Sequence, residues 1–251
     1  MNAAPPSRER LFAALDATWP PLSREMLGEW ALRRGDRGGG RRTAAVWPAG
    51  DPGMALEDAV AAAEARMRAW GQPLYFQIGG APDAELDAAL ATRGYADEAH
   101  CSFLAAPVGD VAAAGTGGRM VVRVRAPLAL FDEMWAAGGI GPARRAVMDR
   151  VAGPKETILI REDDRVAAAC FVAVHDGIAV MSALHVAPRF RRRGVGRASV
   201  AAAAGIGAEL GAEWMAFSVE DDNAPAVALY AGLGFREAAR YHYRTLREDR
   251  R

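Results

Sequence analysis

Short apolar runs of strand length alternate with longer helical patterns along the second half of the chain. Strands are predicted over the ranges 120–125, 156–161, 165–174, 178–186, 214–219 and 235–246. Between two of these runs lies Asp176-Gly177, a pair typical of a hairpin turn. Helices are predicted over 198–210 and 224–231, and another from near Pro127. Hairpins followed by a strand–helix–strand unit indicate a mixed α/β sheet.

The first half repeats this pattern at a constant offset of 140 residues. The shared positions pair Val46 with Val186, Pro48 with Pro188, Gly71 with Gly211, Gly94 with Gly234 and Tyr95 with Phe235. Glycine and proline each mark a particular backbone conformation, so matches at one fixed offset are informative. We therefore predict a duplication; the alternative is two α/β units that are alike by coincidence.

A Gly/Ala-rich segment with little periodicity divides the two halves. We expect an N-terminal domain over 1–106, a linker over 107–118 and a C-terminal domain over 119–251. The offset runs out near the chain start, so the N-terminal copy is expected to be truncated. It is also expected to be degenerate where the second half has its most distinctive residues. At those positions Arg191, Gly194, Gly196 and Tyr230 are replaced by Asp51, Met54, Leu56 and Leu90.

The composition is that of an ordinary globular protein with balanced charge. The chain has 251 residues, of which 51% are apolar, and its 31 basic residues equal its 31 acidic ones. The overall field therefore favours neither nucleic acid nor anionic lipid as a partner. The longest apolar runs are about half the length of a membrane span, and the charged start of the chain is unlike a signal peptide. Two cysteines make neither a disulfide framework nor a zinc site, so we expect a cytoplasmic protein without a metal.

Residues 186–198 carry the main chemical signal, because a strand ends, a glycine-bearing turn follows and a helix begins. The first N–H groups of a helix lack intrahelical partners and favour an anion. Gly194 and Gly196 would let a diphosphate approach these amides. The arginines that would add charge-assisted hydrogen bonds are Arg191, Arg192, Arg193 and Arg197. The segment matches neither a dinucleotide fingerprint nor a P-loop, and a nucleic-acid patch or a solvated basic loop are the alternatives.

The last predicted helix carries a second group of residues. Asn223, Ala226 and Tyr230 follow an i, i+3, i+7 spacing and share one face. A small residue between two polar ones indicates the wall of a groove. The alternative makes Asn223 a helix N-cap and Tyr230 a partly buried core residue.

Together, these two motifs make the chain similar to the GNAT acetyltransferase superfamily over roughly residues 119–251. The matching residues are Arg191-x-x-Gly194-x-Gly196, then Asn223-x-x-Ala226-x-x-Leu229-Tyr230, then Gly234-Phe235. The order of both motifs on these elements is more specific than either alone. The first half then resembles the N-terminal member of a tandem GNAT arrangement.

The resemblance implies acetyl-CoA as co-substrate, bound in a V where the strand 178–186 separates from the strand 214–219. The backbone groups that would hold the pantetheine and polarise the thioester carbonyl are those of Leu184, His185 and Val186. The diphosphate would be held by Arg191, Arg192, Arg193, Gly194, Val195, Gly196 and Arg197.

The resemblance also implies two roles on the last helix. Asn223 would contact the pantetheine arm, and Tyr230 would protonate the departing CoA thiolate. The chemistry agrees, since a phenol with a pKa of about 10 is protonated at neutral pH and can donate to a thiolate.

An amine acceptor must lose a proton before it attacks, so a base or a water chain is needed. Glu156, His185 and Glu220 lie at expected strand ends near the cleft, and water is a fourth candidate. Each of the three side chains also has a structural interpretation. A covalent route would need an activated thiolate, but Cys170 lies in an apolar strand and Cys101 in the first half. We therefore expect direct transfer in a ternary complex.

The sequence leads to an N-acetyltransferase that acts on a primary amine of a small molecule or peptide. A non-catalytic acyl-CoA-binding or regulatory module is the alternative, and a nucleic-acid-binding protein ranks below both. The N-terminal half is a candidate wall of the acceptor cleft. An arginine-rich hairpin there would favour an acidic acceptor, or it is a solvated turn: Arg33, Arg34, Arg37, Arg41 and Arg42. The sequence fixes neither the acceptor nor the oligomeric state.

Overall fold

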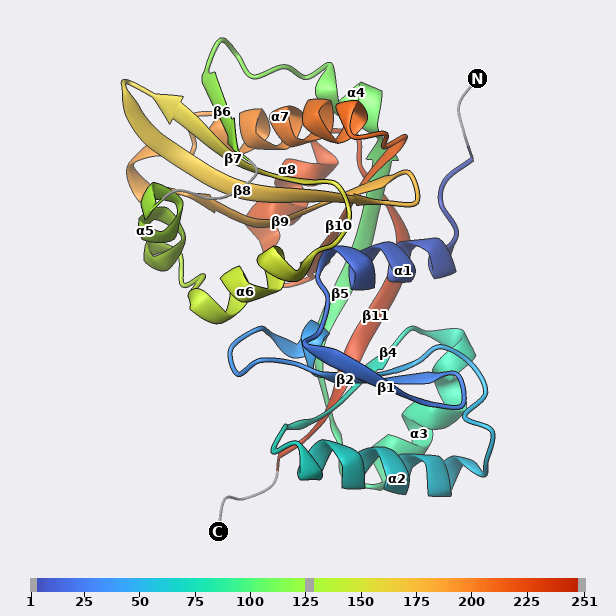
Figure 1. Cartoon of the computed structure of the whole chain (residues 1–251). Coiled ribbons are helices and arrows are strands. Elements are labelled where there is room, and N and C mark those ends of the chain that lie inside the picture. Colours follow the sequence, from blue (N-terminus) through green and yellow to red (C-terminus); the bar gives the residue numbers. More distant parts are fainter. Residues whose placement is uncertain (1–3, 125–128, 248–251) are drawn as a thin grey trace.

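One sheet runs through both halves of the molecule (Figure 1). The computed structural model describes residues 4–124 and 129–247, and in these eleven strands join in the order β1-β2-β3-β4-β11-β5-β10-β9-β8-β7-β6. The strands are β1 Ser23–Leu27, β2 Trp30–Arg34, β3 Val46–Pro48, β4 Leu74–Ile78, β5 Ala96–Pro107, β6 Met120–Val124, β7 Lys155–Glu162, β8 Arg165–His175, β9 Ile178–Val186, β10 Trp214–Glu220 and β11 Arg236–Leu246. The helices are α1 Arg8–Thr18, α2 Leu56–Ala69, α3 Ala84–Thr92, α4 Val108–Ala112, α5 Ala129–Ala137, α6 Pro142–Arg150, α7 Val195–Glu209 and α8 Ala224–Ala231.

The elements predicted in the second half are present, with small shifts at their ends. Asp176 and Gly177 both have positive φ (45° and 71°), as a two-residue hairpin turn requires. Helix α7 begins three residues earlier than predicted, because Gly194 adopts a left-handed conformation and leads the loop directly into the helix. The helix start expected near Pro127 and the strand end at Arg125 lie outside the described residues.

The segment 107–118, expected as a linker, contains helix α4. Its side chains Val108 and Val111 are buried in the same apolar cluster as α7. This part of the segment is thus packed structure, and it contributes to the core of the second half.

The element order of the first half follows that of the second from β3 onwards. Elements α2, β4, α3 and β5 begin 139 or 140 residues before α7, β10, α8 and β11. The hairpin β1–β2 departs from this offset, since Leu32 pairs with Val46 whereas Ala168 pairs with Val186. No described strand of the first half corresponds to β6 at the outer edge of the second. A common origin of the two halves by duplication stays a prediction.

The last strands of the two halves are exchanged. Strand β5 lies between β10 and β11, and β11 lies between β4 and β5, all in antiparallel pairs. Arg236 pairs with Ala105 and Thr245 with Ala96, so the β5–β11 register maps onto itself under the 140-residue offset. In Figure 1 both strands extend through the upper and lower parts of the molecule. Each half therefore completes the sheet of the other.

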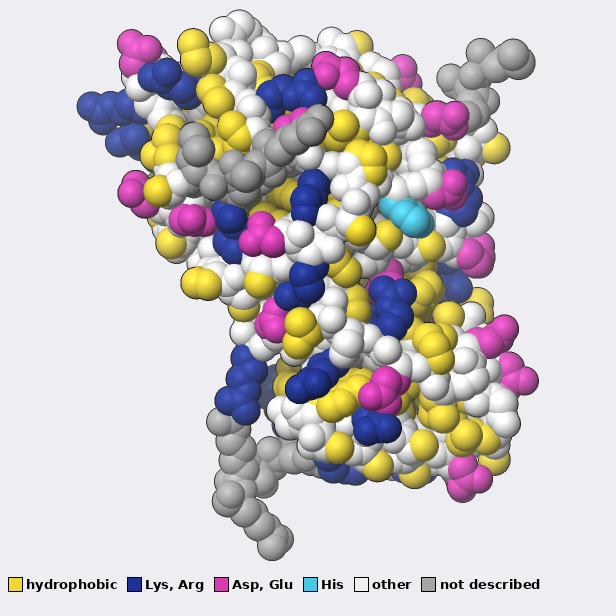
Figure 2. Space-filling view, in the orientation of Figure 1, with side chains coloured by type: hydrophobic (Ala, Val, Ile, Leu, Met, Phe, Trp, Pro, Cys, Tyr) yellow, Lys and Arg dark blue, Asp and Glu magenta, His cyan; other side chains and the backbone are white. Residues whose placement is uncertain are grey.

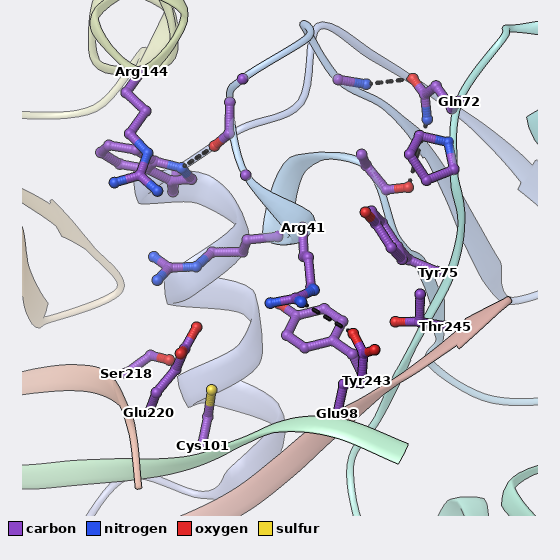
Figure 3. A pocket seen from close by; sticks show the side chains of 18 of the residues that line it. Arg41, Gln72, Tyr75, Glu98, Cys101, Arg144, Ser218, Glu220, Tyr243 and Thr245 are labelled. Atoms are coloured by element: carbon purple, nitrogen blue, oxygen red, sulfur yellow. Dashed lines mark hydrogen bonds and ion pairs between the residues drawn. The ribbon is translucent and has the colours of Figure 1, made fainter. Parts of the chain in front are cut away.

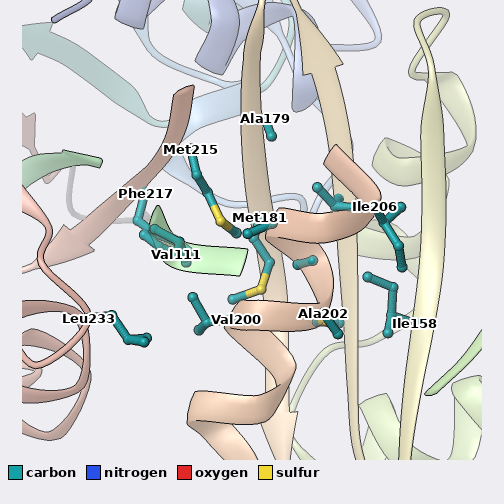
Figure 4. Close-up of a cluster of buried hydrophobic side chains, with 14 of the residues drawn as sticks. Val111, Ile158, Ala179, Met181, Val200, Ala202, Ile206, Met215, Phe217 and Leu233 are labelled. Carbon is teal, nitrogen blue, oxygen red and sulfur yellow. The ribbon is translucent and has the colours of Figure 1, made fainter. Parts of the chain in front are cut away.

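The largest apolar cluster lies between the sheet and α7 (Figure 4). The cluster contains Met181, Met215 and Phe217 of the sheet, and Val200 and Ile206 of α7. Small residues of α7 allow the helix to lie close to β9: a Cβ on Gly207 would be 2.7 Å from the Cβ of Ala179. The alanine-rich sequence of α7 thus sets the helix–sheet distance, and with it the position of the helix N-terminus.

Two observations concern the surface. None of the described helices is both long and apolar enough to cross a membrane. On the face shown in Figure 2, basic and acidic side chains are interspersed, in keeping with the balanced charge of the sequence.

Candidate active site

Strands β9 and β10 separate where the family resemblance implies a V-shaped opening. They pair in parallel only at three positions, from Trp214↔Ile178 to Ala216↔Val180. Beyond Val180, the edge of β9 that faces away from β8 has no strand partner within the described residues. The backbone groups of residues 181–186 on this edge therefore have no strand partner, although the carbonyls of Ala183 and Val186 accept side-chain hydrogen bonds from Trp135 and Arg191.

A β-bulge shapes the β9 side of the opening. The β8–β9 register shifts between Ala169↔His185 and Phe171↔Ser182, and Ala183 has a φ of 56°. The indole N–H of Trp135 donates to the Ala183 carbonyl at 2.9 Å and holds the bulge in place. A bulge redirects the strand, so the turn at Ala183 accounts for the divergence from β10.

The glycine loop between β9 and α7 has the geometry of an anion site. Gly194 has a φ of 80°, and its carbonyl accepts the N–H of Ala198 at 3.0 Å. The preceding residues are anchored by Phe190, which is buried in the main cluster. The amides of 195–197, in the first turn of α7, have no carbonyl four residues back within the helix, so they point out of its N-terminus.

Gly196 has a packing role beside the expected ligand role. A Cβ there would meet Leu229 Cδ2 at 3.3 Å and Val186 Cγ2 at 3.9 Å. The missing side chain therefore lets α7 approach α8 and β9. Gly194 differs, since the nearest atom to a Cβ there would be an Arg119 nitrogen at 3.8 Å.

The four arginines of the loop are not equivalent. Arg193 forms ion pairs with Glu162 and Asp163, both at 2.9 Å. Arg191 donates to the Val186 carbonyl at 3.2 Å and Arg197 donates to the Gly232 carbonyl at 3.1 Å. These two guanidinium groups keep further donors, whereas the charge of Arg193 is already compensated by two carboxylates.

Asn223 is the N-cap of α8, and its side-chain oxygen accepts the N–H of Ala226 at 3.3 Å. The predicted cap is thus present. The carboxamide nitrogen of Asn223 remains as a donor on the exposed side of the helix start.

Tyr230 lies at the inner end of the opening. Its ring stacks on Phe217 with a centroid distance of 4.0 Å, and it lines the same cavity as Leu184. Burial, with a smaller contribution from Cys170, raises the pKa of Tyr230 far above its usual range. Its hydroxyl forms no hydrogen bond within the described residues. The side chain is therefore a protonated donor that is held by its ring alone.

The three candidate bases lie in different places. Glu156 is buried and paired with Arg123 at 3.3 Å, away from the cavity. His185 is buried beside Gly138, its Nε2 has no partner, and burial followed by the charge of Arg191 lowers its pKa. Only Glu220, of these three, lines the cavity with Tyr230.

The cavity spans both halves of the molecule and has a volume of about 1520 Å³ (Figure 3). Its C-terminal wall comes from residues 181–184 of β9 and from Phe217, Ser218 and Glu220 of β10. The opposite wall comes from residues 35–42, 44 and 71–75 of the first half. The expectation that the N-terminal half contributes a wall of the cleft agrees with this lining.

The exchanged strands supply a floor that the sequence did not reveal. Cys101 of β5 and Tyr241 and Tyr243 of β11 line the cavity, and Tyr241 is hydrogen-bonded to Ser218. These residues are far apart in the sequence and carry no recognisable motif. Only the pairing of β5 with both β10 and β11 brings them beside the catalytic candidates.

Helix α2 is the first-half counterpart of α7. Carboxylates lie at its N-terminus, where they would repel an anion. Its first turn contains Glu57 and Asp58, and Asp51 accepts the N–H of Gly53 just before it. These carboxylates compensate the helix dipole themselves. Within the described residues, a glycine-bearing loop whose geometry suits an anion thus precedes the helix of the second half, and the corresponding helix of the first half begins with carboxylates.

The proteins that are similar to this chain include N-acetyltransferases. Residues 128–235, which lie in the second half of the chain, match the model of the acetyltransferase (GNAT) family. The chain is 28% identical over 246 residues to an uncharacterized N-acetyltransferase, YobR, of Bacillus subtilis, covering 95% of this chain and 97% of that protein. It is 40% identical over 96 residues to a mycothiol acetyltransferase of Clavibacter sepedonicus, which is 36% of this chain and 32% of that protein.

Solved structures show the same fold over most of the chain. A GCN5-related N-acetyltransferase from Kribbella flavida superposes with a TM-score of 0.74 at 19% identity, covering 96% of both chains. A tandem GNAT protein from the clavulanic acid biosynthesis pathway superposes with a TM-score of 0.58 at 17% identity, covering 76% of this chain and 69% of that one. The mixed α/β fold predicted from the sequence is confirmed.

Proposed function

We propose that the protein transfers an acetyl group from acetyl-CoA to a primary amine, directly, in a ternary complex. The observation that carries the proposal is the position of Tyr230: a protonated, unpartnered hydroxyl at the inner end of the β9–β10 opening. The left-handed Gly194 and the open amides of α7 suit the diphosphate of the coenzyme.

In the proposed reaction the amine nitrogen attacks the thioester carbonyl carbon and the C–S bond breaks. Free backbone groups on β9 beyond the bulge would bind the pantetheine and polarise the carbonyl. Tyr230 would give its proton to the CoA sulfur. The proton lost by the amine would go to Glu220 or to a water beside it, since this carboxylate shares the cavity with Tyr230.

Diphosphate binding at the loop predicts a charge effect at Gly194. Asp and Asn are both tolerated at positive φ and both cap helices, so Gly194→Asp and Gly194→Asn make the same demand on the backbone. We expect Gly194→Asp to weaken CoA binding by at least about tenfold relative to Gly194→Asn, which is about 1.4 kcal/mol. Titration calorimetry measures this; equal affinities would place the diphosphate elsewhere.

Direct transfer predicts that neither cysteine is needed. Burial raises the pKa of the Cys170 thiol to about 12 and, as the largest effect, that of Cys101 to about 11. Neither is a thiolate at neutral pH. We expect the Cys101→Ala, Cys170→Ala double variant to keep turnover within about threefold of the wild type, measured as thiol released from acetyl-CoA. Loss of turnover by a folded double variant would indicate an acetyl-enzyme.

The same assay separates the proposal from a non-catalytic acyl-CoA-binding module. Tight CoA binding without thiol release for any amine in a broad panel would favour the module. Because both cysteines are free, a reducing, cytoplasmic setting stays part of the proposal.

A further inference from the structure

The first-half wall of the cavity is strongly basic. Six arginines contribute to the lining of the whole cavity, against three acidic residues, Asp36, Glu98 and Glu220. Asp36 is paired with Arg150, and Glu98 is paired with Arg41 and Arg247. Both acidic groups on the first-half wall, Asp36 and Glu98, are therefore already neutralised by ion pairs with arginines.

Arg42 is different from its neighbour Arg41. It is half-buried, and its guanidinium lies over the Trp19 ring at 5.8 Å from the centroid. No carboxylate pairs with it within the described residues. An arginine held against an aromatic ring in a cavity is preorganised to bind an oxyanion.

Glu220 faces the same part of the cavity from the second half. Its carboxylate likewise forms no ion pair within the described residues. Both charges lie near the Cys101 thiol. Burial is the largest cause of its raised pKa; the charge of Glu220 raises this pKa further and the charge of Arg42 lowers it. In Figure 3, Glu220 and Ser218 of the β10 wall lie close to Cys101 of the floor. Opposite charges thus lie near one thiol without pairing with each other.

Arg42 on one wall and Glu220 on the other thus lack an ion-pair partner. A ligand that carries a negative group at one end and a positive group at the other would pair with both. We infer that the acceptor is an amine that also carries an acidic group, a carboxylate or a phosphate. Arg42 would bind the acidic group, and Glu220 would hold the ammonium near the β9–β10 opening. This inference rests on the proposed function and deepens it, since it names the class of acceptor.

Paired acceptors test the inference. Each pair differs in the acidic group: glycine and glycinamide for the carboxylate, phosphoethanolamine and ethanolamine for the phosphate. For each pair we take the ratio of kcat/KM for the acidic member to that for the neutral one. The intrinsic reactivity of the amines then cancels when wild type and variants are compared. The pair with the larger ratio identifies the acidic group.

We expect Arg42→Gln to lower the ratio of the preferred pair by about tenfold or more, because a charge-assisted hydrogen bond is lost. Arg42→Lys should restore part of it. Arg34→Gln is the matched control, since Arg34 is an exposed arginine of the same segment outside the cavity lining. An unchanged ratio in Arg42→Gln would overturn the inference.

A binding measurement keeps this test independent of turnover. If no amine releases thiol, the proposed function fails, and calorimetry with the same pairs in the presence of CoA decides on the acidic-group site alone. Tighter binding of the acidic member, lost in Arg42→Gln, would support the site. Equal binding of both members, or no binding of either, would overturn it.

Discussion

Replacing Tyr230 by phenylalanine should lower turnover by about 10²- to 10⁴-fold, the usual range for the loss of a general acid. CoA affinity should stay within about twofold, because the ring keeps its stacking on Phe217 and its hydroxyl has no partner to lose. Thiol release under saturating acetyl-CoA measures the first effect, and calorimetry the second.

Tyr75→Phe is the control for this variant. Tyr75 also lines the cavity, but on the wall of the first half. Tyr75→Phe removes one phenolic hydroxyl, as Tyr230→Phe does. Turnover should change less than about threefold. If Tyr230→Phe and Tyr75→Phe were equally active, Tyr230 would not be the proton donor.

The burial of Tyr230 also determines how kcat should depend on pH. A raised pKa means that Tyr230 holds its proton throughout the neutral and mildly alkaline range. The alkaline fall in kcat expected for an ordinary phenol near pH 10 should therefore be absent there. A fall below pH 9 that disappears in Tyr230→Phe would contradict this environment.

Residues 119–251 expressed alone should not form a stable domain, although the family match lies entirely within them. Without β5, strand β10 loses all seven pairs from Trp214↔Pro107 to Glu220↔Cys101, and β11 loses both of its neighbours. The core also loses Val108 and Val111 of α4. We expect aggregation or an unfolded circular dichroism spectrum, with no CoA binding.

A nicked chain distinguishes loss of β5 from loss of chain continuity. A protease site inserted at 115–118, between α4 and β6, leaves every strand present after cleavage. The two fragments should co-elute in gel filtration and keep binding CoA. A folded, monomeric fragment 119–251 that binds CoA would refute the structural role given to β5.

Local structure in this protein could be read from the sequence, and contacts between distant segments could not. Helix α8 and strand β9 match their predicted bounds, because the cap Asn223 and the turn Asp176-Gly177 are encoded by neighbouring residues. The exchange of β5 and β11 depends on pairing between strands about 140 residues apart. Both are long strands, of 12 and 11 residues, and nothing local selects one partner over another.

The candidate site shows the same division. The glycine loop and Tyr230 were found from motifs that lie on single elements. The choice among Glu156, His185 and Glu220 required the cavity, since a position near a strand end does not tell which wall a side chain faces. The ion pairs of Arg193 are formed with Glu162 and Asp163, which lie outside the motif. The packing role of Gly196 likewise depends on neighbours that the motif does not contain.

Because the central strands are shared, the two halves cannot be recombined as modules with other proteins. The β9–β10 opening and the opposite wall of the cavity must then be inherited as one unit. New acceptor preferences are then expected to arise by point substitution in the 35–44 segment, which reaches into the cavity and, within the described residues, belongs to no strand. Relatives that keep the glycine loop and differ there should share their coenzyme and diverge in what they modify.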